Sequence, residues 1–150
     1  MIFTRVLLAL TLCVAPVVAQ SKPTKPVTPI SRNAAGLALK GYDPVAYFEV
    51  AKAMAGSPEF SHEIEGARFL FRSEVSKALF AANPTKYMPR FGGYCAWAVD
   101  HNYTAPADSK SWKMVEGKHY LNYNKAVQQK WIAEEGKLIP TGEANWPGLH

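Results

Sequence analysis

The segment best equipped for chemistry surrounds a single cysteine, Cys95. It lies in the run Phe91–Val99, F-G-G-Y-C-A-W-A-V, where two glycines precede the thiol and two large aromatic residues flank it. Thiolates bind soft metals and act as nucleophiles, so the functional hypothesis is a metal ligand or a redox thiol. Free cysteine is also among the most buried residue types, which makes a packing role the structural alternative. We expect Cys95 to be mostly buried and to border a pocket that contains Asp43, Tyr94 or Trp97.

A second motif, Gly41–Phe48, reads G-Y-D-P-V-A-Y-F. Asp43 followed by Pro44 suits the start of a helix, because aspartate caps free backbone N–H groups and proline fits the first turn. A tight structural turn at Asp43-Pro44 explains this motif well.

The Cys95 segment is expected to be extended. Side chains of an extended chain alternate between two sides, so Cys95, Trp97 and Val99 are expected to share one face.

Several catalytic and metal-binding patterns are missing from the sequence. It has no Cys-x-x-Cys-His, no His-Glu-x-x-His, no glycine-rich phosphate loop and no Gly-x-Ser-x-Gly. A zinc hydrolase with three protein ligands would need nearly all of the four histidines. We expect His62 on a half-buried strand, His101 in a polar loop and His119 at a solvated strand position.

Two stretches with the same order of residue types are expected to form the elements that position the candidate site residues. Ile64–Ser73 and Val115–Asn124 match at an offset of fifty-one residues, and each contains Glu-Gly, which can form the turn of a β-hairpin. Ser73 and Asn124 then stand where a helix begins, and both residue types are good N-caps. The pattern predicts an α+β fold, a small single domain of two β-hairpin–helix units with irregular connections.

Apolar spacing supports a helix after each cap. Val75, Ala78, Leu79 and Ala82 recur at i, i+3, i+4 and i+7, as on one helix face, and Val127 and Trp131 recur at i and i+4. Asn83-Pro84 is expected to end the first helix and Gly136 the second.

Length and composition fit one compact core. The chain has 150 residues, 48% of them hydrophobic, and a formal net charge of +5. From Asn33 onward 13 basic residues nearly balance 12 acidic ones, so the folded part shows no basic stripe for nucleic acid.

The N-terminus has the pattern of a secretory signal peptide. Residues 1–19 combine a basic start, an apolar run and the small-residue end Val17-Val18-Ala19. Residues 20–34 form a Pro/Lys-rich linker, and the domain is expected over 35–150. Cleavage removes Cys13 and leaves no stable membrane anchor, which predicts a periplasmic or secreted product whose only thiol is Cys95.

The order of the motifs resembles the YHS domain family, and more narrowly its secreted bacterial single-domain members. The resemblance rests on Asp43-Pro44-Val45, Glu65–Ser73, Phe80 and Asn83–Tyr87, with the narrower likeness in Gly41–Phe48 and Gly92–Val99. It implies a small α+β fold with a role in metal handling.

The metal-binding version of that family pattern is not complete here. In the metal-binding version a cysteine follows Asp-Pro-Val, whereas this chain has Ala46. A cysteine or histidine precedes the helix cap there, whereas this chain has Arg72. A second cysteine often comes three residues later, whereas this chain has Val75. Those ligands cannot be carried over to this chain.

The resulting functional hypothesis is a soft transition-metal module for a copper ion, with Cys95, His62 and Met88 as ligands, since thiolate, imidazole and thioether suit Cu(I). The alternatives are a non-catalytic interaction or small-ligand-binding module with a structural buried cysteine, and a thiol enzyme. No second thiol is available to resolve an intermediate, so no catalytic residue is assigned.

The apolar N-terminal run predicts that export removes residues 1–19. Intact-mass measurement on the exported protein is expected to give a chain that begins near Gln20. A mass that retains Met1–Ala19, or a lipid on Cys13, contradicts this processing.

Overall fold

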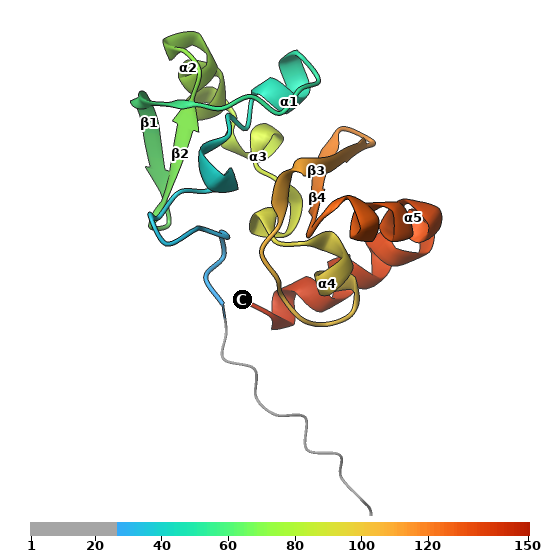
Figure 1. Ribbon diagram of the computed structural model, residues 1–150. Helices are drawn as coiled ribbons and strands as arrows, with labels where there is room; N and C mark the ends of the chain where they lie inside the picture. Colours follow the sequence, from blue (N-terminus) through green and yellow to red (C-terminus); the bar gives the residue numbers. More distant parts are fainter. Residues whose placement is uncertain (1–26) are drawn as a thin grey trace, which may run out of the picture.

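Two antiparallel hairpins, each followed by a helix, organise the protein (Figure 1). The computed structural model describes residues 27–150, so the expected signal peptide, its cleavage site and Cys13 lie outside the described residues. The first unit comprises η1 (Leu39–Gly41), α1 (Ala46–Glu49), β1 (Ser57–Ile64), β2 (Ala67–Phe71) and α2 (Glu74–Ala82). The second comprises η2 (Arg90–Gly93), α4 (Ala96–Asp100), β3 (Asp108–Val115), β4 (Lys118–Asn122) and α5 (Lys125–Asn145). The helix α3 (Pro84–Tyr87) joins the units, and η3 (Trp146–Gly148) follows α5. The α+β class and the two hairpin–helix units expected from the sequence are confirmed.

The two hairpins have the same register. Every paired position of the first recurs fifty-one residues later in the second, from Ile64↔Ala67 beside the turn to Ser57↔Phe71 at the open end. Even the irregularity between Ser57 and Ser61 recurs at the corresponding place in β3. The offset found in the sequence is therefore a structural repeat.

Both hairpin turns use the predicted Glu-Gly pair. Glu65 and Gly66 have φ angles of 50° and 76°, and Glu116 and Gly117 have 50° and 73°. Two successive positive φ values are the signature of a type I′ turn, whose twist matches that of the flanking strands.

The repeat also extends upstream of the hairpins, with an offset of fifty-two. Leu39–Gly41 have φ angles of 52°, 53° and 85°, and Phe91–Gly93 have 53°, 59° and 84°. Glycine is required at Gly92, because an added Cβ would lie 1.8 Å from the carbonyl oxygen of Pro29. The same alignment makes Asp43 and Cys95 equivalent positions, each one residue after a tyrosine that follows the left-handed turn.

Both predicted helix caps are formed. Ser73 Oγ accepts a hydrogen bond from Ser76 N at 3.1 Å, and Asn124 Oδ1 accepts one from Val127 N at 2.9 Å. The helix α2 ends before Asn83, as expected from Asn83-Pro84.

The apolar face predicted for α2 points outward. Val75 is 70% exposed and Leu79 39%, whereas Ser76 and Phe80 are buried. Phe80 packs on Phe69 and Phe71 of β2, with ring centroids 5.0 and 5.2 Å apart. Contact with the hairpin, rather than helical amphipathicity, therefore decides which side of α2 is inside.

The expected end of the second helix at Gly136 is wrong. The helix α5 has a non-helical residue, Glu134 with φ −129°, and then continues to Asn145. Leu138 and Gly142 are buried beyond the irregularity, so packing against α4 stabilises the extension. Among residues 27–150 no helix is both long and apolar enough to cross a membrane.

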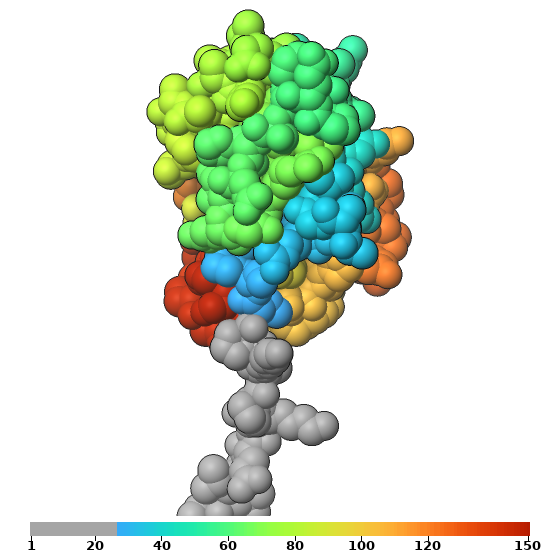
Figure 2. Space-filling model, turned by 90° about the vertical axis from the view of Figure 1, so that its left-hand side faces the viewer, coloured from blue at the N-terminus to red at the C-terminus, as the bar shows by residue number. Residues whose placement is uncertain are grey.

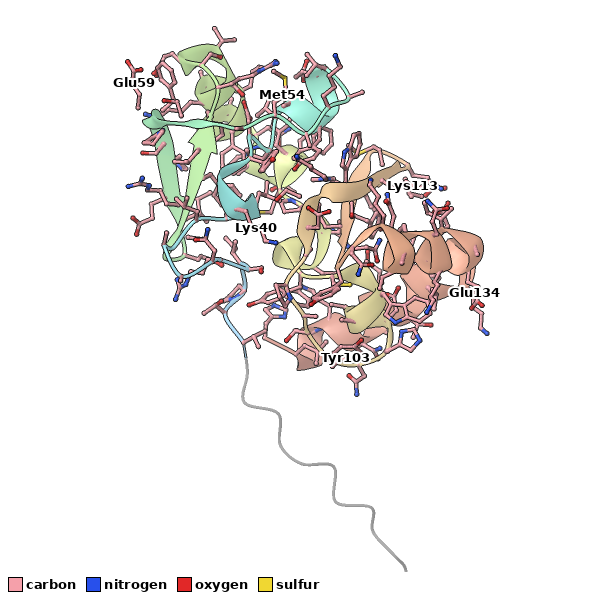
Figure 3. All side chains as sticks on the ribbon, in the orientation of Figure 1. Lys40, Met54, Glu59, Tyr103, Lys113 and Glu134 are labelled. Atoms are coloured by element: carbon pink, nitrogen blue, oxygen red, sulfur yellow. The ribbon has the colours of Figure 1, made fainter. Side chains whose placement is uncertain are left out.

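The units lie side by side and share a core. Buried residues of one cluster come from both units, among them Phe69, Cys95 and Leu121. In a second cluster, Trp131 of α5 packs on Tyr120 of β4. Figure 3 shows the arrangement by its labelled side chains: Lys40 lies between the hairpins, while Met54 and Glu59 lie on the first unit and Lys113 and Glu134 on the second.

The N-terminal segment crosses between the units before the first one begins. Val27 N donates to Leu149 O at 3.1 Å, Ser31 N to Gly92 O at 2.9 Å, and Arg32 Nη1 to Gly66 O at 2.7 Å. Figure 2 shows this blue segment against the red C-terminal end and the green first hairpin. Contacts with the domain thus begin before Ala35, the expected boundary.

We expect both caps to contribute to stability. Ser73→Ala and Asn124→Ala each leave an N-terminal N–H without its acceptor and are expected to lower the free energy of unfolding by about 0.5–2 kcal/mol. Urea denaturation measures this change. Lys130→Ala, at an exposed position of α5, is the control, and equal stability of all three variants contradicts the role of the caps.

Candidate functional site

Asp43 is a buried structural acceptor. Its Oδ1 accepts from Val45 N at 2.8 Å, and its Oδ2 accepts from Arg72 N at 3.0 Å and Ser76 Oγ at 2.5 Å. Arg72 Nε lies 3.8 Å from Oδ2. These bonds join the start of α1 to the end of β2 and to α2. Because both carboxylate oxygens accept hydrogen bonds within the fold, the role of Asp43 is to hold α1, β2 and α2 of the first unit together.

Cys95 occupies the same place in the second unit. Its sulfur accepts from Tyr123 N at 3.2 Å, and Tyr123 is the repeat equivalent of Arg72. Asn122 Oδ1 lies 3.9 Å from the sulfur and accepts from Trp97 N at 3.3 Å. A thiol thus replaces a carboxylate as the acceptor that ties a short helix to the end of a hairpin.

The surroundings of Cys95 favour a neutral, inert thiol. Its exposed fraction is 1%, which confirms the expected burial. Burial raises its pKa, although the backbone N–H groups of Ala98, Tyr123 and Trp97 act in the opposite direction. The residues after it form α4 instead of the extended segment considered above. A buried thiol with a raised pKa is a poor nucleophile at neutral pH.

The three expected copper ligands lie on different elements. Cys95 precedes α4, whereas His62 is on β1, where its ring is 6.0 Å from that of Phe80. Met88 follows α3 and packs against the shared core. Within the described residues, no group of three or more His, Cys, Asp or Glu side chains could hold a metal ion. Copper binding by these three residues stays a prediction.

Tyr94 and Trp97 contact different parts of the fold. Tyr94 Oη donates to Thr28 O at 3.1 Å, which fastens the N-terminal segment. Trp97 stacks on His101, with ring centroids 4.2 Å apart. His101 ends α4 and is exposed.

His119 departs most from expectation, because it is completely buried rather than solvated. The ring of Tyr47 lies 4.0 Å from its imidazole, and the rings of Trp112 and Phe48 lie 5.9 and 6.1 Å away. The repeat aligns His119 with the exposed Arg68, but α1 covers only the second hairpin at this position.

The imidazole of His119 has an unusual environment. Neither ring nitrogen has a hydrogen-bond partner among residues 27–150. Burial lowers its pKa to about 3, so the ring is neutral at physiological pH. Leaving a buried polar group without a partner costs about 1–3 kcal/mol. The sequence pattern did not indicate that this imidazole is buried. The hairpin register set by the Glu-Gly turn does already pair His119 with Met114.

Asp100 is a second buried polar group. Trp131 Nε1 donates to its Oδ2 at 2.7 Å, whereas Oδ1 has no partner among the described residues and faces Gly142, where an added Cβ would lie 2.0 Å away. Burial raises the pKa of Asp100 to about 6, partly offset by the bond from Trp131 and by His101. The carboxyl group therefore changes its charge near neutral pH.

A cavity of about 360 Å³ lies between the two units, and we name it the seam cavity. The turn of the first hairpin, α3, η2, the N-terminal segment and the C-terminal end form its walls. The lining residues are Pro29, Ile30, Ile64, Glu65, Pro84, Thr85, Met88, Pro89, Arg90, Phe91, Gly92, Trp146 and His150. Of the six residues proposed from the sequence as site residues, Met88 is the one that lines it.

Comparison of the chain with protein-family models, with curated proteins and with solved structures finds no match.

The raised pKa of Asp100 predicts a pH-dependent stability. The folded state keeps the proton up to about pH 6, whereas the unfolded chain loses it near pH 4. The stabilisation is therefore complete below pH 4 and is lost as pH rises through 6. Relative to Asp100→Asn, the wild-type free energy of unfolding is expected to fall by about 2 kcal/mol between pH 4 and 7.

Denaturation at several pH values measures this difference. Asp108→Asn is the matched control, because the pKa of Asp108 is lowered and its contribution has the opposite pH dependence. A constant difference between wild type and Asp100→Asn contradicts the assignment.

Proposed function

We propose that the protein is a non-catalytic binding module and that the seam cavity receives a small, largely apolar ligand that bears a ring. The observation that carries the proposal is the cavity itself, about 360 Å³ in volume and walled by segments from both units. Ligand sites in proteins are concave, mainly apolar and about 300–1,000 Å³ in size.

The lining favours an apolar, flat ligand. Phe91 and Trp146 lie 5.9 Å apart between ring centroids, and both line the cavity with Ile64 and Met88. Aromatic rings prefer offset or edge-to-face neighbours at such distances, so a ligand ring can pack between or beside them.

The charged residues of the lining do not favour an anion, because Glu65 adds a negative charge. Arg90 Nη2 pairs with Glu143 Oε1, so its guanidinium charge is balanced inside the protein. His150 stacks on Trp146 at 4.2 Å and its Nδ1 contacts Trp146 O at 2.8 Å. A neutral ligand therefore suits the cavity better than a strongly anionic one.

The walls are held in place before a ligand arrives. Pro29, Pro84 and Pro89 have restricted backbones, and the bond from Ser31 N to Gly92 O fastens the N-terminal segment beside the cavity. Such preorganisation reduces the entropy lost on binding.

A thiol enzyme has less support than a binding module. Cys95 is buried, its pKa is raised, and it is not among the residues that line the seam cavity. Its bond from Tyr123 N accounts for it as a structural acceptor.

A test uses 1-naphthol as the probe and NMR chemical-shift changes as the readout. We expect saturable shifts at Gly92 N–H and at the Trp146 indole N–H. Thr85 is exposed at the cavity wall, so Thr85→Trp is expected to fill the cavity and weaken binding by about tenfold or more, which corresponds to about 1.4 kcal/mol.

The control places the same side chain elsewhere. Lys137 is exposed on α5 and does not line the seam cavity, so Lys137→Trp is expected to bind like wild type. Equal affinity of Thr85→Trp and wild type, or shifts that do not saturate, rules out the seam cavity as the site.

A further inference from the structure

The buried imidazole of His119 lies beside a thioether and two aromatic rings. Met114 on β3 is paired with His119 on β4, and Trp112 precedes Met114 by two residues on the same strand. Directly paired residues of an antiparallel hairpin project to one face, with Cβ atoms about 4.5–5.5 Å apart. Residues two apart on a strand share that face too. Sulfur, imidazole and indole are thus neighbours on the side of the hairpin that α1 covers.

The ring nitrogens of His119 are unused by the protein. Neither has a hydrogen-bond partner among residues 27–150, although the side chain is fully buried. Tyr47 lies against the ring at a tilt of 33°, so it covers a face of the imidazole and leaves the plane of the ring, where the nitrogens point, to other neighbours. A neutral imidazole keeps one lone pair in that plane, and this lone pair can bind a metal.

We propose that His119 and Met114 bind a single soft monovalent cation, Cu(I), beneath Trp112. Imidazole nitrogen and thioether sulfur are soft enough for Cu(I), whereas hard cations require oxygen ligands. The indole of Trp112 lies at 77° to the imidazole, with ring centroids 5.9 Å apart, and indole is the aromatic ring that attracts cations best. The lone pair coordinates directly, so binding releases no proton and transfers no electron.

The site also has a route of entry. Met114 is partly exposed, while His119 beneath it is fully buried. An ion can therefore meet the sulfur first and then the imidazole. This site is independent of the seam cavity, and it uses none of Cys95, His62 and Met88.

The test titrates the purified protein with Ag(I), a redox-inert ion of the same softness, and follows the ring ¹⁵N resonances of the histidines. We expect one Ag(I) per chain, a shift of one ring nitrogen of His119, and quenching of tryptophan fluorescence that Trp112→Phe abolishes. Met114→Leu preserves the side-chain volume and is expected to weaken binding by about tenfold or more. Competition with bicinchoninate then repeats the comparison with Cu(I).

Matched variants separate this site from the thiol of Cys95 and the thioether of Met88. Met88→Leu and Cys95→Ser are expected to bind Ag(I) like wild type. Three results overturn the proposal: no Ag(I) bound, unchanged affinity in Met114→Leu, or binding lost in Cys95→Ser that keeps the wild-type circular dichroism spectrum. Since Thr85→Trp blocks naphthol binding and Met114→Leu weakens silver binding, either proposed site can fail without the other.

Discussion

A backbone N–H at the end of each hairpin must find an acceptor inside the protein, and this requirement fixes how each unit is built. In the first unit Arg72 N donates to Asp43, and in the second Tyr123 N donates to the sulfur of Cys95. Each acceptor precedes a short helix, so one bond sets the position of that helix against its hairpin. Because Asp43 and Cys95 are buried, this bond constrains what packs around each acceptor.

The repeated units differ in the acceptor at this bond. The acceptor is a carboxylate in one and a thiol in the other, although the turns, registers and caps agree. A thiol can replace the carboxylate because sulfur accepts a hydrogen bond and packs like a small apolar group. Cys95 accordingly belongs to the shared core with Leu121, on which both units depend.

Both proposed binding sites lie along the contact between the units. The seam cavity brings the first hairpin's turn together with the chain's C-terminal end, and the His119 group brings α1 against the second hairpin. Inside each unit, repeated hydrogen bonds hold the short helix and the N-terminus of the following helix. Residues at the contact meet a different neighbour in each unit, and the ring nitrogens of His119, unpaired within residues 27–150, and the open volume of the seam cavity both lie there.

Local signals in the sequence determined the hairpins, their Glu-Gly turns and the caps Ser73 and Asn124, because these depend on backbone angles and on bonds a few residues apart. The tertiary structure alone decided which side of α2 is buried and that α5 continues past Gly136, because packing outweighs helix amphipathicity and a single glycine. The tertiary structure also decided that the side chain of His119 is buried. The sequence aligns that residue with the exposed Arg68, but burial depends on α1, whose position no local pattern encodes.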